Sequence, residues 1–222
     1  MSTVYADTDD SLTFNSAPDT WANVRGDVSS SSSTHSNSFS GSTIGINTRA
    51  FSGRGTTYRR NSRSYFPFDL SGVSGTATAV SLNVYADNLG YYTDEDASIF
   101  VVQSTALAGG TSDYGNCFSS GTTLGTLFGI GVSSTTEGYC TITFNSGGIS
   151  AVNSAIGSGT LTLGCLSYYD FTNTAPTTGS NYAKIKLTYA NYTGTSRDPY
   201  LDITYGGAAA ATDNATFFGC NF

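Results

Sequence analysis

Apolar and polar residues alternate along several short stretches of this chain. A period of two places the apolar side chains on one face of a β-strand, whereas a helix repeats them every three or four residues. Each stretch is bounded by Gly, Ser, Asn or Pro, as strands in globular proteins usually are. The pattern therefore predicts strands. The alternating stretches are 65–70, 80–86, 140–144, 161–165, 184–189 and 201–205.

The repeated alternation also indicates how these strands are arranged. Antiparallel strands with one apolar and one polar face pack face to face as a sandwich or close into a barrel. Residues 99–102 are apolar without interruption, which is typical of a more deeply buried strand. We predict an all-β fold over residues 1–205, a jelly-roll-like antiparallel β-sandwich.

One short helix is predicted between Ser146, its expected N-cap, and Gly157, its expected stop. Within this segment Ile149, Val152 and Ile156 recur at helical spacing. A single apolar stripe of this kind suits a helix that covers one end of a sandwich. We expect it to act as a plug for the core.

Residues 206–222 are predicted to form a C-terminal spacer and an apolar docking tail. The segment starts with Gly and Ala residues and ends near Phe217, Phe218 and Phe222. Burying one such ring is worth roughly 1.5–3 kcal/mol, so three of them exposed to water would be wasteful. We expect the tail to dock on a neighbouring subunit, or alternatively to fold back on its own domain.

The composition favours a folded surface protein. Of 222 residues 38% are hydrophobic and 11% charged, and 15 Tyr and 13 Phe supply enough aromatic mass for a core. The net charge of −7 argues against nucleic acid as a partner. No apolar run is long enough for membrane insertion, and the N-terminus lacks signal-peptide features. Synthesis in a host cytoplasm followed by release on a virion surface reconciles these features.

Two neighbouring motifs resemble the DNRLRE-type β-sandwich modules, a family that includes carbohydrate-binding modules and virion surface domains. They are SYFPFDLSGV at 64–73 and AVSLNVYA at 79–86, and matching features follow at 141–156 and in DPYLDITY at 198–205. The resemblance implies a β-sandwich over about residues 1–205. Pro67 stands where the family commonly has Arg, so no residue at this position of the chain can take over a ligand-binding role of that arginine. Because Pro lacks an N–H, Pro67 is expected at an edge or a non-bonded position.

Five of the nine cationic residues lie in one stretch that contains no Asp or Glu. Arginine presents a planar fork that suits carboxylates, sulfates or phosphates. This pattern suggests docking onto an acidic neighbouring subunit or an anionic glycan, and a solvated strand face is the alternative. The residues are Arg49, Arg54, Arg59, Arg60 and Arg63.

The sequence predicts no cofactor. The acidic runs at 7–10 and 94–96 lack the spacing of a calcium loop, so solvated turns are expected, with structural calcium as the alternative. His35 is the only histidine, and the cysteines form no C-x-x-C pair, which argues against zinc. Buried thiols are predicted at two cysteines, with a disulfide as the alternative for any of the four. The buried pair is Cys140 and Cys165, and the others are Cys117 and Cys220.

No catalytic residue is predicted. No acidic pair lies in an aromatic motif typical of glycoside hydrolysis, and a Ser–His–Asp set would depend on His35 in a Ser-rich segment. Tyrosine rings stack on sugars and are favoured at interfaces, because each has an apolar body and a polar tip. Tyr91 and Tyr92 are the expected contact surface, and most other tyrosines are expected to pack within the sandwich.

These observations predict a non-enzymatic phage virion structural protein, such as a capsid decoration, spike or fibre component. We expect a homo-oligomer that docks on other virion subunits and also contacts a host surface glycan. A secreted or cell-surface carbohydrate-binding module is the alternative, and a polysaccharide depolymerase is a more remote one.

Overall fold

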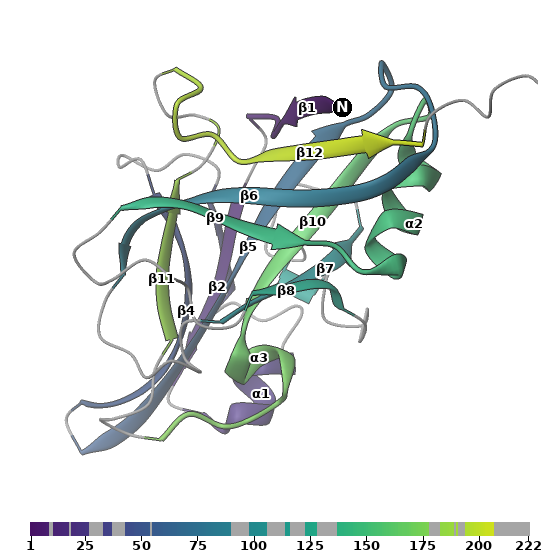
Figure 1. The fold of residues 1–222 in the computed structure, drawn as a ribbon. Coiled ribbons are helices and arrows are strands. Elements are labelled where there is room, and N and C mark those ends of the chain that lie inside the picture. Colours follow the sequence, from purple (N-terminus) through teal and green to yellow (C-terminus); the bar gives the residue numbers. More distant parts are fainter. Residues whose placement is uncertain are drawn as a thin grey trace, which may run out of the picture.

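A computed structural model gives the fold of this chain (Figure 1). It describes residues 1–8, 11–17, 19–26, 33–36, 43–53, 55–89, 98–105, 114–115, 123–127, 137–177, 183–188, 190 and 194–206. The elements in chain order are β1 (Ser2–Tyr5), β2 (Ser11–Ala17), α1 (Trp21–Gly26), β3 (Ser33–Ser36), β4 (Thr43–Gly53), β5 (Thr56–Asp69), β6 (Ala77–Leu89), β7 (Ile99–Ser104), β8 (Thr123–Leu127), β9 (Gly138–Thr143), α2 (Ser146–Ala155), β10 (Thr160–Ser167), α3 (Tyr168–Phe171), β11 (Ala183–Thr188) and β12 (Tyr200–Tyr205).

All the described strand pairs are antiparallel, so the predicted all-β antiparallel sandwich is confirmed. The front layer runs β1-β12-β6-β9, and the back layer runs β3-β2-β5-β10-β7-β8. Figure 1 shows the strands of the front layer crossing in front of the diagonal strands of the back layer. Each layer thus presents one face to the core and one face outward.

The two layers are joined through their long strands, β5 in the back layer and β6 in the front layer. Along one edge β5 pairs with β2, and along the other it pairs first with β4 and then with β10. In the same way β6 has β9 on one edge and β12 followed by β11 on the other. Because β4 pairs with β11, these two strands form a side wall between the layers.

On the opposite side of the sandwich, Gly125 in β8 forms a β-bridge with Phe144, which brings the two layers together there. The backbones approach closely there. A Cβ atom on Gly125 would lie 2.9 Å from the carbonyl oxygen of Thr143, which is shorter than real contacts allow. Glycine at this position therefore permits the contact between β8 and the segment that follows β9.

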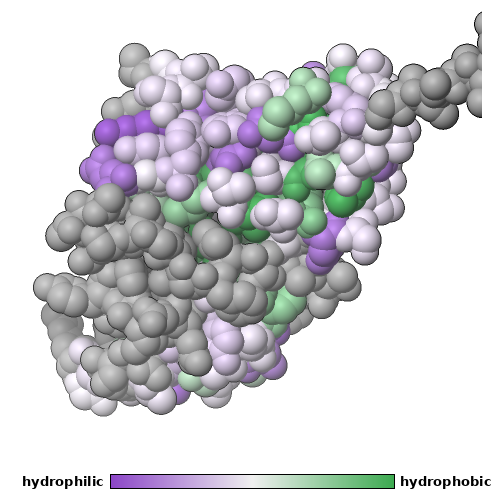
Figure 2. All heavy atoms as spheres, viewed as in Figure 1, coloured by the Kyte–Doolittle hydropathy of each residue, from purple (hydrophilic) through white to green (hydrophobic). Residues whose placement is uncertain are grey.

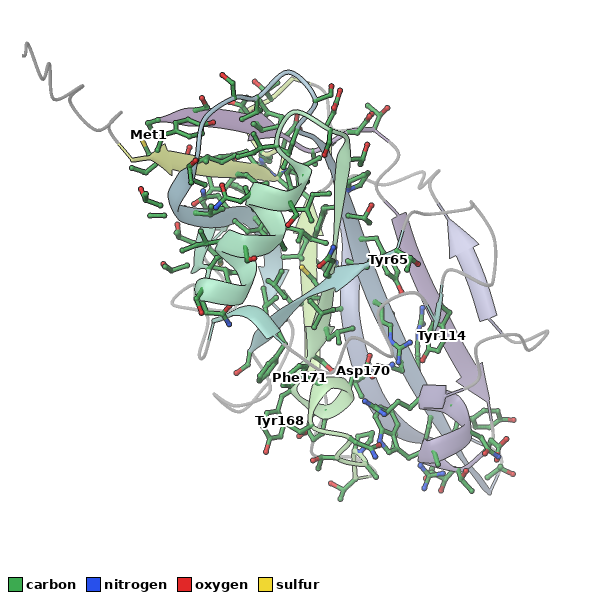
Figure 3. The ribbon with its side chains drawn as sticks, turned by 90° about the vertical axis from the view of Figure 1, so that its right-hand side faces the viewer. Met1, Tyr65, Tyr114, Tyr168, Asp170 and Phe171 are labelled. Atoms are coloured by element: carbon green, nitrogen blue, oxygen red, sulfur yellow. The ribbon has the colours of Figure 1, made fainter. Side chains whose placement is uncertain are left out.

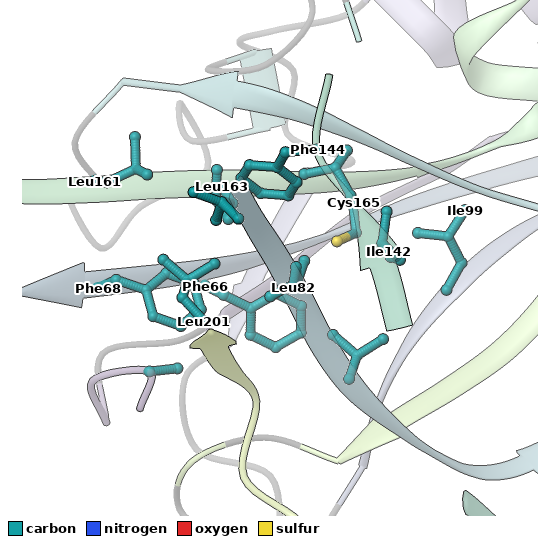
Figure 4. Close-up of a cluster of buried hydrophobic side chains, with 14 of the residues drawn as sticks. Phe66, Phe68, Leu82, Ile99, Ile142, Phe144, Leu161, Leu163, Cys165 and Leu201 are labelled. Carbon is teal, nitrogen blue, oxygen red and sulfur yellow. The ribbon is translucent and has the colours of Figure 1, made fainter. Parts of the chain in front are cut away.

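The core lies between the two layers, where inward-facing residues of both meet (Figure 4). The alternation predicted these positions, because a strand turns every second side chain to the same face. The run at 99–102 is also buried throughout. The buried core residues from the predicted strands include Phe66, Phe68, Leu70, Val80, Leu82, Val84, Ile142, Phe144, Leu161, Leu163, Ile185, Leu187, Leu201 and Ile203.

Cys140 and Cys165 are buried within this core, as predicted. Burial removes water from the Cys140 thiol and raises its pKa to about 11. Cys117 and Cys220 lie outside the described residues. The two described cysteines thus contribute apolar packing.

The predicted helix is present as α2, and its buried Val152 packs on the core. Its N-cap is Asn145 rather than Ser146, since the Gly148 amide donates to Asn145 Oδ1 at 3.0 Å. Gly157 follows the helix with φ of 73°, a left-handed conformation that suits glycine, so the predicted stop is confirmed.

Helices α1 and α3 were not predicted. Both are short, and both lie against the outer face of the back layer (Figure 3). Phe171 of α3 stacks on Phe100 of β7 with ring centroids 4.4 Å apart. This cover explains why the run at 99–102 is apolar on both faces.

The described surface in Figure 2 is mostly polar, with apolar residues gathered in small groups, some of them at α2. Among the described residues, no helix has the length and apolar character needed to cross a membrane. Strand β12 is followed by Gly206, whose amide donates to the Thr76 carbonyl oxygen at 3.1 Å. Residues 207–222 lie outside the described part of the chain.

Candidate functional site

A buried ion pair lies on the outer face of the back layer. In β5 the even-numbered residues 66 and 68 face the core, so the odd-numbered ones face the helices α1 and α3. Arg63 is fully buried there, and its Nε donates to Asp170 Oδ2 of α3 at 2.7 Å. Its Nη2 donates to Asp170 Oδ1 at 3.0 Å, which completes a bidentate pair. Figure 3 shows Asp170, Tyr114 and Tyr65 gathered beside these helices.

Three further side chains complete this buried charge cluster. Asn61 Nδ2 donates to Asp170 Oδ2 at 2.8 Å, and Arg25 Nε of α1 lies 3.2 Å from Asp170 Oδ1. Tyr114 places its ring 4.1 Å from the Arg63 guanidinium carbon and accepts a hydrogen bond from Arg63 Nη1 at its carbonyl oxygen. The cluster therefore joins α1, β5, α3 and the segment around Tyr114.

The Asp170 carboxylate is ionised in this setting. Burial alone would raise its pKa, but the Arg63 guanidinium, the hydrogen bond from Asn61 and the Arg25 charge together hold the pKa below its ordinary value. Both carboxylate oxygens already accept hydrogen bonds or contact a guanidinium. The cluster is thus a structural connection, with its acceptors occupied.

The structure does not bring the five predicted arginines together on one surface. Arg63 is enclosed in the cluster, so it does not face an external partner. Arg59 is half-buried, and its Nη1 donates to the Asp19 carbonyl oxygen at 2.6 Å. Arg60 is half-buried and adjacent in the strand, so it lies on the opposite face from Arg59, and Arg49 is its register partner in β4.

The remaining predicted contact residues lie outside the described part of the chain. The same holds for the acidic run at 94–96, while Asp7 is exposed and accepts from the Thr8 amide at 2.6 Å. Within the described residues, no group of three or more His, Cys, Asp or Glu side chains is placed to hold a metal ion. The undescribed contact residues are Arg54, the side chain of Arg49, Tyr91, Tyr92, Phe217, Phe218 and Phe222.

A row of tyrosines whose rings contact one another crosses the outer face of the front layer. Tyr5 and Tyr200 have ring centroids 5.7 Å apart, Tyr200 and Tyr139 5.2 Å, and Tyr139 and Tyr85 5.2 Å. The last two contacts are edge-to-face, an arrangement that aromatic rings prefer. We call these four residues, which come from β1, β12, β9 and β6, the tyrosine row.

Strand register builds this row. Tyr5 pairs with Tyr200, and Tyr85 pairs with Tyr139, so directly opposed rings point to the same face. Their neighbours Leu201 and Val84 face the core, which turns the tyrosines outward. Tyr5 is 45% exposed and Tyr139 37%, which makes them two of the most exposed large hydrophobic side chains described.

Charged groups stand at one end of the row. The Arg197 guanidinium carbon lies 4.7 Å from the Tyr85 ring centroid, and its Nη2 lies 3.1 Å from Glu137 Oε2. Tyr139 Oη donates to the Asp198 carbonyl oxygen at 3.1 Å. Loss of water contact, together with the neighbouring tyrosines and Asp198, raises the pKa of Tyr139 to about 12. The Tyr139 phenol is therefore a neutral hydroxyl at ordinary pH.

The sequence predicted other tyrosines as the contact surface and left this row unnamed. A signal was present, because Tyr85, Tyr139 and Tyr200 each occupy the polar position of an alternating stretch or precede its first core residue. Which strands are neighbours was not readable from that pattern, so the four tyrosines could not be recognised as one row.

A scan against protein-family models and a search of curated proteins find no match to this chain.

Proposed function

We propose that this chain is a non-enzymatic structural and attachment protein of a phage virion surface, and that it binds host surface glycans through the tyrosine row. The row is the observation that supports this proposal. Sugar rings present C–H faces that pack on aromatic rings and hydroxyls that hydrogen-bond with polar tips. A row of tyrosines offers both kinds of contact along one line.

The setting of the row supplies stacking surfaces that are already in place. All four rings stand on strands or at strand ends of one antiparallel layer, and each contacts its neighbour. Rings that are already ordered lose little conformational entropy when a ligand binds. The outward neighbours Thr3, Thr141 and Thr143 are exposed hydroxyl residues that can hydrogen-bond with a sugar, and Asp202 on the same face already accepts from Thr3 Oγ1 at 2.8 Å.

Docking on other virion subunits is the second half of the proposal. Residues 207–222 extend the chain beyond Gly206, and their apolar end supports a role in anchoring to a particle. The proposed location is the virion surface, in a homo-oligomer. The alternative is a secreted or cell-surface carbohydrate-binding module, which would use the same tyrosine face without the particle.

Affinity electrophoresis tests the sugar-binding half. The protein is run in native gels that contain hydroxyethyl cellulose, galactomannan or dextran, with polygalacturonate as the acidic comparison. We expect retardation by at least one neutral polysaccharide, and its loss in the double variant Tyr139→Ala/Tyr200→Ala. Tyr58→Ala is the matched control, because Tyr58 is a half-buried strand tyrosine in β5 outside the row. Release of reducing ends from the retarding polysaccharide would contradict a non-enzymatic role.

Particle fractionation tests the structural half. We expect the chain to co-purify with particles from a lysate of the organism that encodes it, and a variant that lacks residues 207–222 to stay in the soluble fraction. Circular dichroism of the truncated protein controls for folding. Glycan binding without particle association would instead favour the carbohydrate-binding module. Particle association without glycan binding would overturn the attachment role and leave the structural one.

A further inference from the structure

We propose that Asn83 and Asp198 form the polar subsite of the tyrosine row, which binds sugar hydroxyls and determines which sugar is accepted. This inference rests on the proposed glycan-binding function. It assigns selectivity to two polar side chains next to the rings, while the rings themselves supply stacking that depends little on which sugar is bound.

Asn83 lies under the middle of the row. In β6 it pairs with Tyr200 on one side and with Thr141 on the other, and Tyr139 is the residue next to Thr141 in β9. Since the Tyr139 and Tyr200 rings touch, they meet across β6 at this position. Asn83 is only 4% exposed as a result. Thr141 Oγ1 donates to Asn83 Oδ1 at 2.7 Å, and the Asn83 Nδ2 donor has no hydrogen-bond partner among the described residues.

Asp198 lies at the end of the row that carries Arg197. Asp198 lies two residues before Tyr200, and its carbonyl oxygen accepts a hydrogen bond from Tyr139 Oη at 3.1 Å. The preceding residue, Arg197, lies over the Tyr85 ring. Asp198 is 6% exposed, and its Oδ1 acceptor is buried without a hydrogen-bond partner among the described residues. Loss of water contact raises the pKa of this carboxyl. Its charge in turn contributes to the raised pKa of the Tyr139 phenol.

The buried Asn83 Nδ2 donor and the buried Asp198 Oδ1 acceptor carry the same kind of energetic cost. A polar group held away from water without a partner costs free energy, and native proteins keep few of them. A ligand that supplies the missing partners removes this cost, so binding gains from groups that the free protein leaves unsatisfied. The amide N–H needs an acceptor, and the carboxylate oxygen needs a donor.

Sugar hydroxyls meet both needs, because each donates and accepts. Apolar protein side chains meet neither, and an anionic ligand would be repelled by Asp198. The neutral glycan is therefore the ligand that the row and the two buried groups fit together. Access requires the Tyr139 ring to turn aside, and this ring is partly exposed on the outer face. Recognition through such groups is selective, since a sugar that lacks the matching hydroxyl leaves them unpaired.

The test uses the full chain and whichever neutral polysaccharide retards it. Asn83→Leu and Asp198→Asn preserve side-chain size and remove the donor or the charged acceptor. We expect each to weaken binding at least about tenfold and to reduce the difference in retardation between hydroxyethyl cellulose, galactomannan and dextran. Asp202→Asn is the matched control, because this carboxylate lies on the same face of β12 but already accepts from Thr3 Oγ1 at 2.8 Å.

Thermal unfolding separates this role from a structural one. Asp198→Asn removes a poorly hydrated charge, so its melting temperature should rise while its binding falls. Unchanged binding and unchanged selectivity in both variants, with the wild type still retarded, would overturn the inference and leave the proposed function standing. If no neutral polysaccharide retards the wild type, the proposed glycan binding and this inference both fail.

Discussion

At the residue scale, the contacts of Arg63 explain how a low-charge protein tolerates buried ions. Removing a guanidinium and a carboxylate from water is costly, and their attraction offsets that cost only when the remaining hydrogen-bonding groups are also satisfied. Here Arg63 contacts Asp170, the Tyr114 carbonyl oxygen and ring, and the Arg25 carbonyl oxygen. The arrangement is therefore sensitive to the loss of a single partner.

Arg63→Ala should lower the free energy of unfolding by about 3–5 kcal/mol, because it leaves the Asp170 charge buried without its main counterion. Urea unfolding followed by circular dichroism measures this. Arg59→Ala is the control, since Arg59 is half-buried and makes one described hydrogen bond, to a carbonyl oxygen. A loss below about 1 kcal/mol for Arg63→Ala would contradict the structural role of the cluster.

The depressed pKa of Asp170 predicts an acid dependence of stability. The unfolded chain takes up a proton on this group near pH 4, while the folded protein resists protonation until lower pH. The stabilisation is thus complete above that range and is lost as the pH falls through the folded-state pKa. Asp170→Asn should be less stable at neutral pH and lose less of its remaining stability on acidification. Urea midpoints measured between about pH 6 and pH 3 compare the two proteins, and parallel curves would be inconsistent with this linkage.

At the element scale, the short helix α3 forms through a local capping signal together with packing on the sheet. α3 begins after Ser167, whose Oγ accepts from the Asp170 amide at 3.2 Å. A helix of this length is not stable alone, so its formation depends on contacts with the sheet. Phe171 on Phe100, and Asp170 on Arg63, supply those contacts. The capping residue Ser167 is visible in the sequence, but whether a helix forms after it depends on the packing of Phe100 and Arg63 against that segment.

The N-cap of α2 gives a prediction at this scale. Asn145→Ala removes the side-chain acceptor of the Gly148 amide and should destabilise the protein by about 1 kcal/mol. Ser146→Ala, at the neighbouring exposed position that the sequence suggested as the cap, should change stability by less than about 0.5 kcal/mol. Thermal unfolding of both variants distinguishes the two assignments, and the reverse order would restore Ser146 as the cap.

At the scale of the whole molecule, the sandwich depends on connections between its two layers. One side is closed by the β4–β11 wall, and the other side depends on the approach of Gly125 to Thr143 and Phe144. The buried side chains are large and apolar, so water entry along either side would expose core surface. Closure is thus a property of the assembled fold rather than of any strand.

Gly125→Ala should separate β8 from the segment after β9, because the new Cβ would lie 2.9 Å from the backbone carbonyl oxygen of Thr143. It would also lie 3.1 Å from side-chain atoms of Ile142 and Phe144. We expect a loss of about 1–3 kcal/mol, which differential scanning calorimetry would detect as a lower melting temperature. Gly72→Ala is the matched control, since a Cβ there meets nothing within 4 Å. Equal melting temperatures for the two variants would show that the bridge does not hold this side closed.

The sequence by itself determined seven of the described strands with their inward faces, the position of α2 and the burial of two cysteines. Strands β1 to β4 and β8 lie outside the stretches that predicted strands. The features that the sequence determined follow from a period of two or of 3.6, which is a local property of the chain. It did not determine which strands are neighbours, and the tyrosine row exists only through that register. It also did not reveal that Arg63 pairs with Asp170, 107 positions later. Read along the chain, the five neighbouring arginines look like a charged surface. The tertiary structure instead buries Arg63, because the Asp170 carboxylate compensates the free-energy cost of removing its charge from water.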